Sequence, residues 1–306
     1  MIDSVCLNEL KAFADDGSFF EKEPMRNHTT FRVGGEADAF LSVHSEKQLQ
    51  DVTKYLNKEN IPYYVIGNGS NLLVSDQGYR GVILSIGKDF AKVEICGNKV
   101  IAQAGALLSV VAKAAMKESL TGMEFASGIP GSIGGAIVMN AGAYDGEMKQ
   151  IVESVTVLTN AGEIITYSNE EMDFSYRHSR MKSEGGIVLS VVLRLEEGNQ
   201  ESILEKTKDF AGRRKDKQPL EFPSAGSTFK RPEGHFAGKL IMDAGLRGYS
   251  VGDAQVSEKH CGFVINKGNA TAKDIYTLIC DVKEKVREQF SVELEPEVIF
   301  LGEMEK

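Results

Sequence analysis

Hydrophobic residues recur at two spacings along the first 120 residues, and this pattern predicts strands that alternate with helices. Apolar residues at helical spacing follow Ser45-Glu46-Lys47-Gln48, which has the form of a helix-capping box, so a helix is predicted over 46–60. A second helix is predicted over 106–120. Short apolar runs predict strands at 39–43, 62–66, 81–86, 93–95 and 100–104, and a polar loop at 67–71 leads into apolar residues 72–74.

The chain beyond residue 150 mixes strands and helices less regularly. Apolar runs on either side of Asn160-Ala161-Gly162 predict a hairpin of strands at 151–158 and 163–167, and a longer run predicts a buried strand at 187–195. Helices are predicted at 170–174, 202–217, 236–244 and 271–290, and strands at 262–265 and 292–301. The polar residues 196–200 mark a boundary before a small α+β unit, and the strand-rich middle beside helices predicts an α+β or mixed α/β protein.

Composition and charge exclude several classes of protein. The 306 residues suggest about two domains, and 35 basic against 44 acidic residues give a net charge of −9, which argues against nucleic-acid binding. No apolar run reaches the ~18 residues of a membrane span, and the first residues do not resemble a signal peptide. The histidines lack metal-ligand spacing, so we expect no metal site. The cysteines form no close pairs, so we expect a cytoplasmic protein; they are Cys6, Cys96, Cys261 and Cys280.

Glycine is the one residue type in clear excess. The chain has 31 glycines in 306 residues, about 10% against a usual ~7%. Backbone N–H groups in a glycine-rich segment are unobstructed, which suits a pyrophosphate or a flat ring, but close packing of a helix on a strand also requires glycine. Both interpretations remain open for the densest segment, 128–146, which contains Gly128, Gly131, Gly134, Gly135, Gly142 and Gly146.

A second glycine-containing segment, 67–71, does not fit the dinucleotide-binding fingerprint. Its third glycine is missing, and the residues that follow predict a strand instead of a helix whose N-terminus would hold a phosphate. The segment is therefore either a plain hairpin-like loop or a nest of backbone N–H groups that binds an anion without a helix.

Polar residues gather in four further places. Tyr176-Arg177-His178-Ser179-Arg180 and a second group near residues 213–231 place positive charge where an anionic small molecule could bind, although a solvated helix face would look the same. Ser227 lacks the G-x-S-x-G context of a hydrolase nucleophile, so by itself it reads as a turn hydroxyl. Glu293, Glu295 and Glu297 share one face of the predicted last strand, and a strand face with such residues is usually exposed to solvent.

Six motifs in fixed order resemble one known family, the UDP-N-acetylenolpyruvoylglucosamine reductases. They are N-x-T-T-F-R-V-G-G at 27–35, G-N-G-S-N-L-L-V at 67–74, G-I-P-G-S-I-G-G-A-x-x-M-N-A-G-A-Y at 128–144, Y-R-H-S at 176–179, A-G-S-T-F-K-R-P at 225–232 and L-E-P-E-V at 294–298. The resemblance spans most of the chain, and the absence of additional segments points to the shorter subclass of the family.

The resemblance implies a two-lobed FAD-binding domain of the vanillyl-alcohol-oxidase type, with lobes at 1–80 and 81–199, and a C-terminal α+β substrate domain at 200–306. Neither glycine segment contains a histidine for covalent attachment, so FAD is expected to bind non-covalently. The cofactor-binding residues it implies are Arg32, Gly67, Asn68, Gly69, Ser70, Asn71, Leu72, Gly128, Pro130, Gly131, Ser132, Gly134, Gly135, Asn140 and Gly142.

The resemblance also implies a reaction and its residues. NADPH would reduce the flavin, and flavin N5 would pass a hydride to UDP-N-acetylglucosamine enolpyruvate, giving the peptidoglycan precursor UDP-N-acetylmuramate. Arg177 and Glu297 would flank the enolpyruvyl carboxylate, and Ser227 would protonate the carbanion. The residues expected to contact the UDP-sugar are Tyr144, Tyr176, Arg213, Lys217 and Arg231, and no obligate protein partner is expected.

Two other functions are compatible with the same fold. A flavin oxidase would turn over an alcohol or hydroxy acid with O₂ and without NADPH. A non-catalytic nucleotide-sugar-binding protein would lack a flavin absorption band even after reconstitution with FAD.

Overall fold

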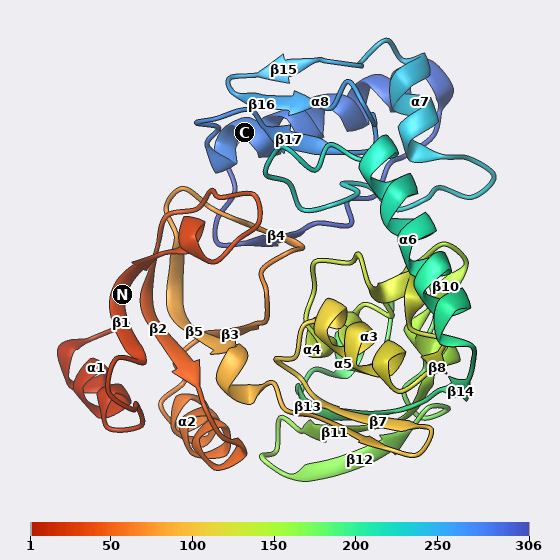
Figure 1. Ribbon diagram of the computed structural model, residues 1–306. Coiled ribbons are helices and arrows are strands. Elements are labelled where there is room, and N and C mark those ends of the chain that lie inside the picture. The colour runs from red at the N-terminus through yellow and green to blue at the C-terminus, as the bar shows by residue number, and fades with distance from the viewer. Residues whose placement is uncertain (1, 306) are drawn as a thin grey trace.

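A four-stranded sheet forms the N-terminal part of the protein (Figure 1, red to orange). The computed structural model describes residues 2–305. The sheet order is β1 (Phe19–Pro24), β2 (Glu36–Val43), β5 (Tyr79–Ile86) and β3 (Tyr63–Ile66), with β1 antiparallel to β2 and the other pairs parallel. Helix α1 (Ser4–Lys11) precedes it, and helix α2 (Glu46–Lys58) begins where the Ser45 side chain accepts from the Gln48 amide, as predicted. α2 buries Leu49, Val52 and Leu56.

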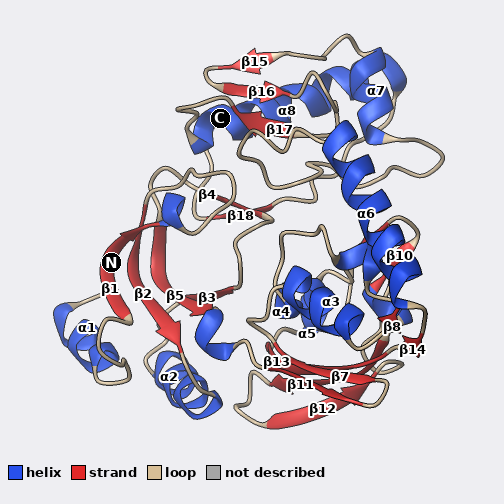
Figure 2. Ribbon diagram, in the orientation of Figure 1, coloured by secondary structure: helices blue, strands red, loops and turns tan. Residues whose placement is uncertain are grey.

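A five-stranded antiparallel sheet forms the second structural layer. Its order is β12 (Ile164–Ser168), β11 (Val152–Leu158), β13 (Ile187–Arg194), β7 (Lys99–Gln103) and β6 (Val93–Cys96). Helices α3 (Leu108–Lys117) and α4 (Ile133–Val138) cover one face of this sheet (Figure 2). α3 buries Leu108, Val111, Ala112 and Ala115, which belong to a core cluster that also includes residues of the first sheet. β5 crosses the expected lobe boundary at residue 80, and the division into lobes stays a prediction.

The C-terminal part has its own hydrophobic cluster. Helices α7 (Ala237–Asp243) and α8 (Ala272–Phe290) pack with a three-stranded sheet of β15 (Ser250–Val251), β16 (Ala254–Val256) and β17 (Val264–Asn266). This cluster also includes Phe31 and Leu73 from the N-terminal part. β18 (Ile299–Leu301) pairs in parallel with β4 (Leu72–Val74), so the end of the chain returns to the strand that follows the 67–71 loop.

A long helix connects the second sheet to the C-terminal part. α6 (Gln200–Lys217) runs up one side of the molecule, shown in teal in Figure 1. Short pieces complete the described chain: the strands β8 (Leu120–Thr121), β9 (Gly142–Ala143), β10 (Gly146–Glu147) and β14 (Glu196–Glu197), the helix α5 (Arg180–Glu184), and the 3-10 helices η1 (Met25–Asn27), η2 (Lys88–Phe90), η3 (Glu124–Ala126) and η4 (Met148–Gln150).

Gly212 weakens α6, and replacing it is expected to stabilise the protein. It lies in the helix interior, and no heavy atom lies within 4 Å of the position that a Cβ would occupy. Gly212→Ala should therefore raise the free energy of unfolding by about 0.5–1 kcal/mol, because alanine loses less backbone entropy on folding. Gly97 has equal space but a φ of +60°, so Gly97→Ala should lower stability. Urea unfolding of both variants tests this, and destabilisation by Gly212→Ala would contradict it.

Several predicted elements are wrong. The expected strand at 292–301 is a strand only at Ile299–Leu301, and the preceding residues run irregularly past Pro296, so the glutamates of this segment do not share one strand face. Residues 170–174 form turns instead of a helix. Helix α4 inside the glycine-rich segment was not predicted, and neither were α1 and β1. Within residues 2–305, no helix combines the length and apolar character that crossing a membrane requires.

Candidate active site

The two glycine-containing segments lie against each other at one place in the structure. A Cβ on Gly67 would stand 2.1 Å from Ser132 Oγ. The Asn68 side-chain amide donates to the carbonyl of Pro130 at 2.7 Å. Gly69, with φ +58°, passes so close to the His28 carbonyl that a Cβ would be 1.9 Å from its oxygen. Residues 67–71 and 128–132 are therefore joined into one surface, although about 60 residues separate them in the chain.

The glycines of the 128–146 segment have two different surroundings. Gly134, Gly142 and Gly146 are packed against protein atoms: a Cβ would meet Ala104 Cβ at 3.0 Å, the Gly146 carbonyl oxygen at 2.7 Å and the Phe125 ring at 2.6 Å, respectively. A Cβ on Gly131 or Gly135 would meet nothing nearer than 3.7 Å. Close packing therefore explains part of the glycine excess, and Gly131 and Gly135 leave open backbone that another molecule could contact.

The 29–32 segment connects the first glycine loop to the C-terminal part. The Thr30 amide donates to the Gly69 carbonyl at 3.2 Å, and the Thr30 hydroxyl donates to the Ser224 carbonyl at 2.6 Å. The next residues include Arg32, which is exposed with φ +57°. The loop that carries Ser227 is in this way anchored to the loop that carries Gly69.

Glu297 lies where the C-terminal chain crosses both of these loops. Its amide donates to the Thr228 carbonyl at 2.8 Å, and its carbonyl accepts from the Asn71 side-chain amide at 3.1 Å. The neighbouring Lys230 amide donates to the Glu295 carbonyl at 2.9 Å. Thr228 is fully buried, and its hydroxyl accepts from the Val264 amide at 2.9 Å, so this crossing is held firmly; the adjacent Ser227 is exposed.

The Glu297 carboxylate pairs with Arg177. Arg177 Nε lies 2.6 Å from Glu297 Oε1, and the two side chains are only 20% and 14% exposed. The Nε–H bond is not directed at this oxygen, so the contact is an ion pair, and the buried Nε has no hydrogen-bond acceptor among residues 2–305. Burial raises the pKa of Glu297 above its ordinary value, although the charges of Arg177, Lys182 and Lys230 oppose the shift. The site thus holds, beside a fixed cation, a carboxyl that is protonated more readily than an ordinary glutamate.

The raised pKa of Glu297 predicts a measurable pH dependence of stability. A carboxyl whose pKa is higher in the folded state stabilises the fold below its unfolded pKa, and this contribution is lost as pH rises through the folded pKa. The wild type should therefore lose stability relative to Glu297→Gln as pH rises above about 4.5, the ordinary value. Glu171→Gln is the control, because the Ser168 amide lowers the pKa of Glu171, so the stability difference from wild type should change with pH in the opposite direction. Thermal melts at a series of pH values test this, and parallel curves for wild type and Glu297→Gln would contradict it.

A tight turn presents Arg177 to this carboxylate. The amides of Ser175 and His178 each donate to the other residue's carbonyl, at 3.2 and 3.1 Å, and Arg177 has φ +54° between them. Asn140 holds the turn through its side chain, which donates to the Ser175 carbonyl at 3.0 Å and to Glu147 at 3.1 Å. The Asn140 side chain is thus engaged in internal hydrogen bonds, and its expected contact with the cofactor stays a prediction.

The residues expected to contact the sugar nucleotide are distributed around this centre. The Tyr176 hydroxyl accepts from the Arg231 amide at 3.1 Å, which joins the Arg177 turn to the loop after Lys230. Tyr144 stacks on Phe210 of α6, with ring centroids 4.5 Å apart. Arg213 is exposed and pairs with Asp209 at 2.7 Å, and Lys217 is exposed at the end of α6. Tyr176 and Arg231 are therefore joined to each other, whereas Tyr144 and Arg213 both contact Phe210, since the Arg213 guanidinium lies 5.8 Å from the centroid of that ring.

Curated relatives show the family of this chain. It is 54% identical over 281 residues to a UDP-N-acetylenolpyruvoylglucosamine reductase of Clostridium kluyveri (strain NBRC 12016), covering 92% of each chain. It is 52% identical over 304 residues to the reductase of the same name from Clostridium novyi (strain NT), covering 99% of each. The chain belongs to the UDP-N-acetylenolpyruvoylglucosamine reductase family.

Family models and solved structures agree with this membership of the UDP-N-acetylenolpyruvoylglucosamine reductases. Residues 218–301 match the C-terminal domain of that family, and residues 37–168 match an FAD binding domain. The crystal structure of the Thermus caldophilus reductase superposes with a TM-score of 0.81 at 37% identity, covering 92% of this chain and 98% of that one. A variant of Phl p 4, a glucose oxidase, has a TM-score of 0.50 at 15% identity over 63% of this chain and 44% of its own, which reflects the fold alone. The predicted α+β fold with a vanillyl-alcohol-oxidase-type FAD domain is confirmed.

Two cations of this reductase were missed as candidates by sequence reasoning. Lys182 of α5 donates from its ammonium to the Arg177 carbonyl at 3.1 Å. Arg214 lies against the glycine segment, because a Cβ on Gly128 would be 3.3 Å from its guanidinium, and burial lowers its pKa. In the sequence, Arg214 is one of several basic residues in the group near residues 213–231, and the period of α6 alone does not show which of them faces the glycine segment.

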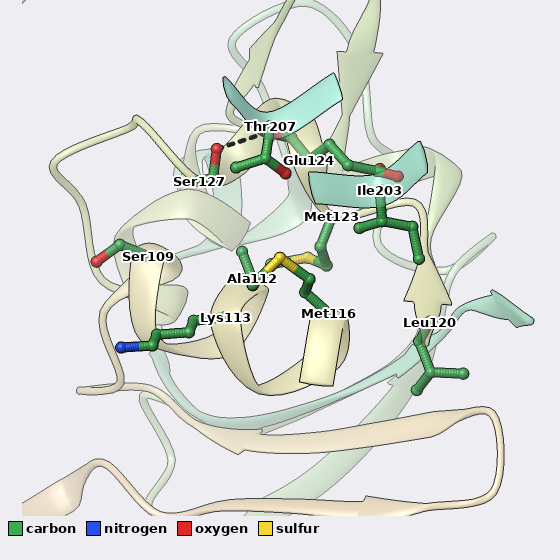
Figure 3. Close-up of a pocket in the computed structure, with 10 residues that line it drawn as sticks. All are labelled: Ser109, Ala112, Lys113, Met116, Leu120, Met123, Glu124, Ser127, Ile203 and Thr207. Atoms are coloured by element: carbon green, nitrogen blue, oxygen red, sulfur yellow. Dashed lines mark hydrogen bonds between the residues drawn. The ribbon is translucent and has the colours of Figure 1, made fainter. Parts of the chain in front are cut away.

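A separate pocket of about 260 Å³ lies between α3 and α6 (Figure 3). Its apolar lining comes from Ala112 and Met116 of α3, from Leu120 and Met123 in the segment after α3, and from Ile203 of α6. Glu124 borders it with both carboxylate oxygens occupied, by the Thr121 hydroxyl at 2.5 Å and the Gly122 amide at 2.9 Å. None of the site residues predicted from sequence lines this pocket. Across residues 2–305, no group of three or more His, Cys, Asp or Glu side chains is arranged to hold a metal ion.

Proposed function

We propose that this reductase uses NADPH and non-covalently bound FAD to convert UDP-N-acetylglucosamine enolpyruvate to UDP-N-acetylmuramate for peptidoglycan synthesis. The observation that carries the proposal is the largely buried pair of Arg177 and Glu297, in which the Glu297 backbone is hydrogen-bonded to Asn71 of the first glycine loop and to Thr228 of the Ser227 loop. The guanidinium of Arg177 is a planar, charged donor that suits a carboxylate, and the enolpyruvyl group carries one.

FAD fits the joined glycine loops. Gly131 and Gly135 leave space beside the backbone that side chains would otherwise fill, and the nearby residues Asn68 and Ser132 fix the two loops to each other. Neither loop contains a histidine, which supports non-covalent binding. When bound, FAD supplies the capacity to take a hydride from NADPH and to deliver one to the enol ether.

Arg177 and Glu297 would act on charge that develops in the substrate. Hydride addition to the terminal carbon of the enolpyruvyl double bond leaves negative charge on the carbon next to the carboxylate, and this charge is delocalised as an enolate. The guanidinium of Arg177 stabilises that charge without leaving its position. Glu297 contributes while protonated, because only the protonated form can donate a hydrogen bond to the enolate, and its raised pKa favours that form.

Ser227 would deliver the proton that completes the reaction. Its hydroxyl is exposed on a loop whose next residue, Thr228, is buried and fixed to Glu297 by a backbone hydrogen bond. A serine hydroxyl is a weak acid, so proton delivery needs Lys230, Arg231 or a water molecule to favour the alkoxide.

The remaining proposals concern the residues that contact the UDP-sugar, the cellular compartment and the partners of the protein. We assign the UDP-sugar to the side of the site bordered by Tyr144, Tyr176 and Arg231, with Arg213 and Lys217 nearby on α6. We place the reaction in the cytoplasm because Cys6, Cys96, Cys261 and Cys280 are all free thiols, which suits a reducing compartment. No nucleic acid, membrane or obligate protein partner is required by this chemistry.

Anaerobic half-reactions test the proposed function. NADPH is expected to bleach the flavin absorbance near 450 nm, and UDP-N-acetylglucosamine enolpyruvate is then expected to restore it. Turnover of an alcohol with O₂ and without NADPH would instead support an oxidase. A protein that gains no flavin band after reconstitution with FAD would support a non-catalytic binding protein.

Substitutions at two neighbouring glycines distinguish loss of cofactor contact from disturbed packing. Gly131→Ala adds a methyl group that makes only ordinary van der Waals contacts within the protein, so it should leave the stability of the apoprotein unchanged and weaken FAD binding at least about tenfold. Gly134→Ala pushes against Ala104, so it should lower the free energy of unfolding by about 1–3 kcal/mol. FAD titration followed by flavin fluorescence, with urea unfolding of the apoproteins, measures both effects. Normal FAD affinity in Gly131→Ala would contradict the proposed cradle.

A further inference from the structure

Arg177 occupies a backbone conformation that an arginine rarely adopts. The turn at residues 175–178 has φ +54° at Arg177, a position that glycine or asparagine usually fills. Such a conformation costs about 1 kcal/mol or more and persists where the surroundings hold it in place. The surroundings of this turn must therefore include groups that compensate the cost.

Two lysines hold the turn from opposite sides. Lys149 donates from its ammonium to the Phe174 carbonyl at 3.1 Å, just before the turn. Lys182 donates from its ammonium to the carbonyl of Arg177 itself, also at 3.1 Å. Lys182 starts from α5, which begins at Arg180 directly after Ser179, and the buried Ser179 hydroxyl donates to the Val138 carbonyl at 2.8 Å. The base from which Lys182 reaches back to Arg177 is thus fixed to α4.

Lys182 also lies within the charge cluster around Glu297, whereas Lys149 does not. Glu297 faces Arg177 from the turn, Lys182 from α5 and Lys230 from the Ser227 loop. Lys230 is itself paired with Glu295. Burial and the charge of Lys230 lower the pKa of Lys182, while Glu295 and Glu297 act in the opposite direction. Lys182 therefore touches the backbone of one member of the Arg177–Glu297 pair and acts electrostatically on the other.

We infer that Lys182 is a positioning residue, which holds the Arg177 turn against the Glu297 carboxylate. The inference rests on the proposed function, because it assigns Lys182 to the second half-reaction, in which Arg177 and Glu297 meet the substrate. Lys182 touches neither substrate nor cofactor in this role. Its hydrogen bond fixes the guanidinium, and its charge limits how far the Glu297 carboxyl is displaced toward the protonated form.

The experiment compares Lys182→Met, Lys182→Arg and Lys149→Met in the FAD-loaded protein. Lys182→Met should slow flavin reoxidation by UDP-N-acetylglucosamine enolpyruvate about tenfold or more, a typical effect of losing a charged hydrogen bond, and leave flavin reduction by NADPH unchanged. In the pH profile of reoxidation, the limb that reports the ionisation of Glu297 should move to higher pH, because removing the positive charge of Lys182 raises the pKa of Glu297. Lys182→Arg, which keeps donor and charge, should restore both rate and profile. Lys149→Met should not move the limb.

Each alternative result has a distinct meaning. A Lys182→Met variant that matches Lys149→Met in both rate and pH profile overturns the inference, and so does equal slowing of both half-reactions. If Lys182→Met proves unstable in a thermal melt, Lys182→Gln replaces it. This variant keeps a donor without the charge, so the limb of its pH profile should still move to higher pH even if the reoxidation rate falls less. If wild-type flavin is reduced by NADPH but not reoxidised by this substrate, the proposed function itself fails, a result recorded before any variant is compared.

Discussion

Ser227→Ala is expected to slow the second half-reaction strongly while leaving the first intact. Loss of a positioned general acid typically slows proton transfer by about 10²–10⁴, so reoxidation of the flavin by the enol ether should slow by that factor. Flavin reduction by NADPH needs no proton from Ser227, and its rate should not change. Anaerobic stopped-flow measurement of the two half-reactions distinguishes these effects.

A nearby serine provides the control for this variant. Ser224 lies in the same loop, and it engages the rest of the protein through its carbonyl, which accepts from Thr30 at 2.6 Å. Ser224→Ala should therefore leave both half-reactions at wild-type rates. Equal loss of both half-reactions in Ser227→Ala would show that the loop, and not the hydroxyl, had been disturbed, and the role as acid would be rejected.

Arg177→Lys is expected to have the second largest effect. Lysine keeps the positive charge and has the same backbone cost at φ +54°, but it lacks the planar fork that can meet a carboxylate with two donors. Charged hydrogen bonds contribute about 1.5–3 kcal/mol, so reoxidation should slow by about 10–100-fold and reduction by NADPH should remain. Single-turnover kinetics with the enol ether measure the change.

Arg180→Lys is the matched control for the arginine variant. Arg180 lies three residues further on, and it pairs with Glu184 at 3.4 Å on α5, away from Glu297. Its replacement should leave both half-reactions close to wild-type rates. Near-normal turnover in Arg177→Lys would count against the assignment, because charge alone would then suffice.

Helices and strands were predicted correctly where the residues that stabilise them lie within the same segment of the chain. The helices predicted at 46–60 and 271–290 are observed at Glu46–Lys58 and Ala272–Phe290, because their caps Ser45 and Thr271 and their apolar faces are encoded within each segment. The strand predicted at 292–301 failed because its pairing is not local: Ile299–Leu301 pairs with β4, more than 220 residues earlier in the chain. Helix α4 escaped prediction because glycines disfavour a helix, yet the Ser132 cap and packing on Ala104 compensate.

The amino-acid sequence by itself determined the order of the motifs, the glycine-rich segments and, through resemblance, the family. Only the tertiary structure decided which of those glycines pack against protein and which leave open backbone, because that depends on neighbours such as Ala104 and Phe125. The resemblance implied that Arg177 and Glu297 flank one carboxylate, but only the tertiary structure shows that they contact each other at 2.6 Å, 120 residues apart in the chain, with both side chains largely buried. Burial raises the pKa of a carboxyl because water no longer solvates its charge, and no pattern of residues along the chain carries that information.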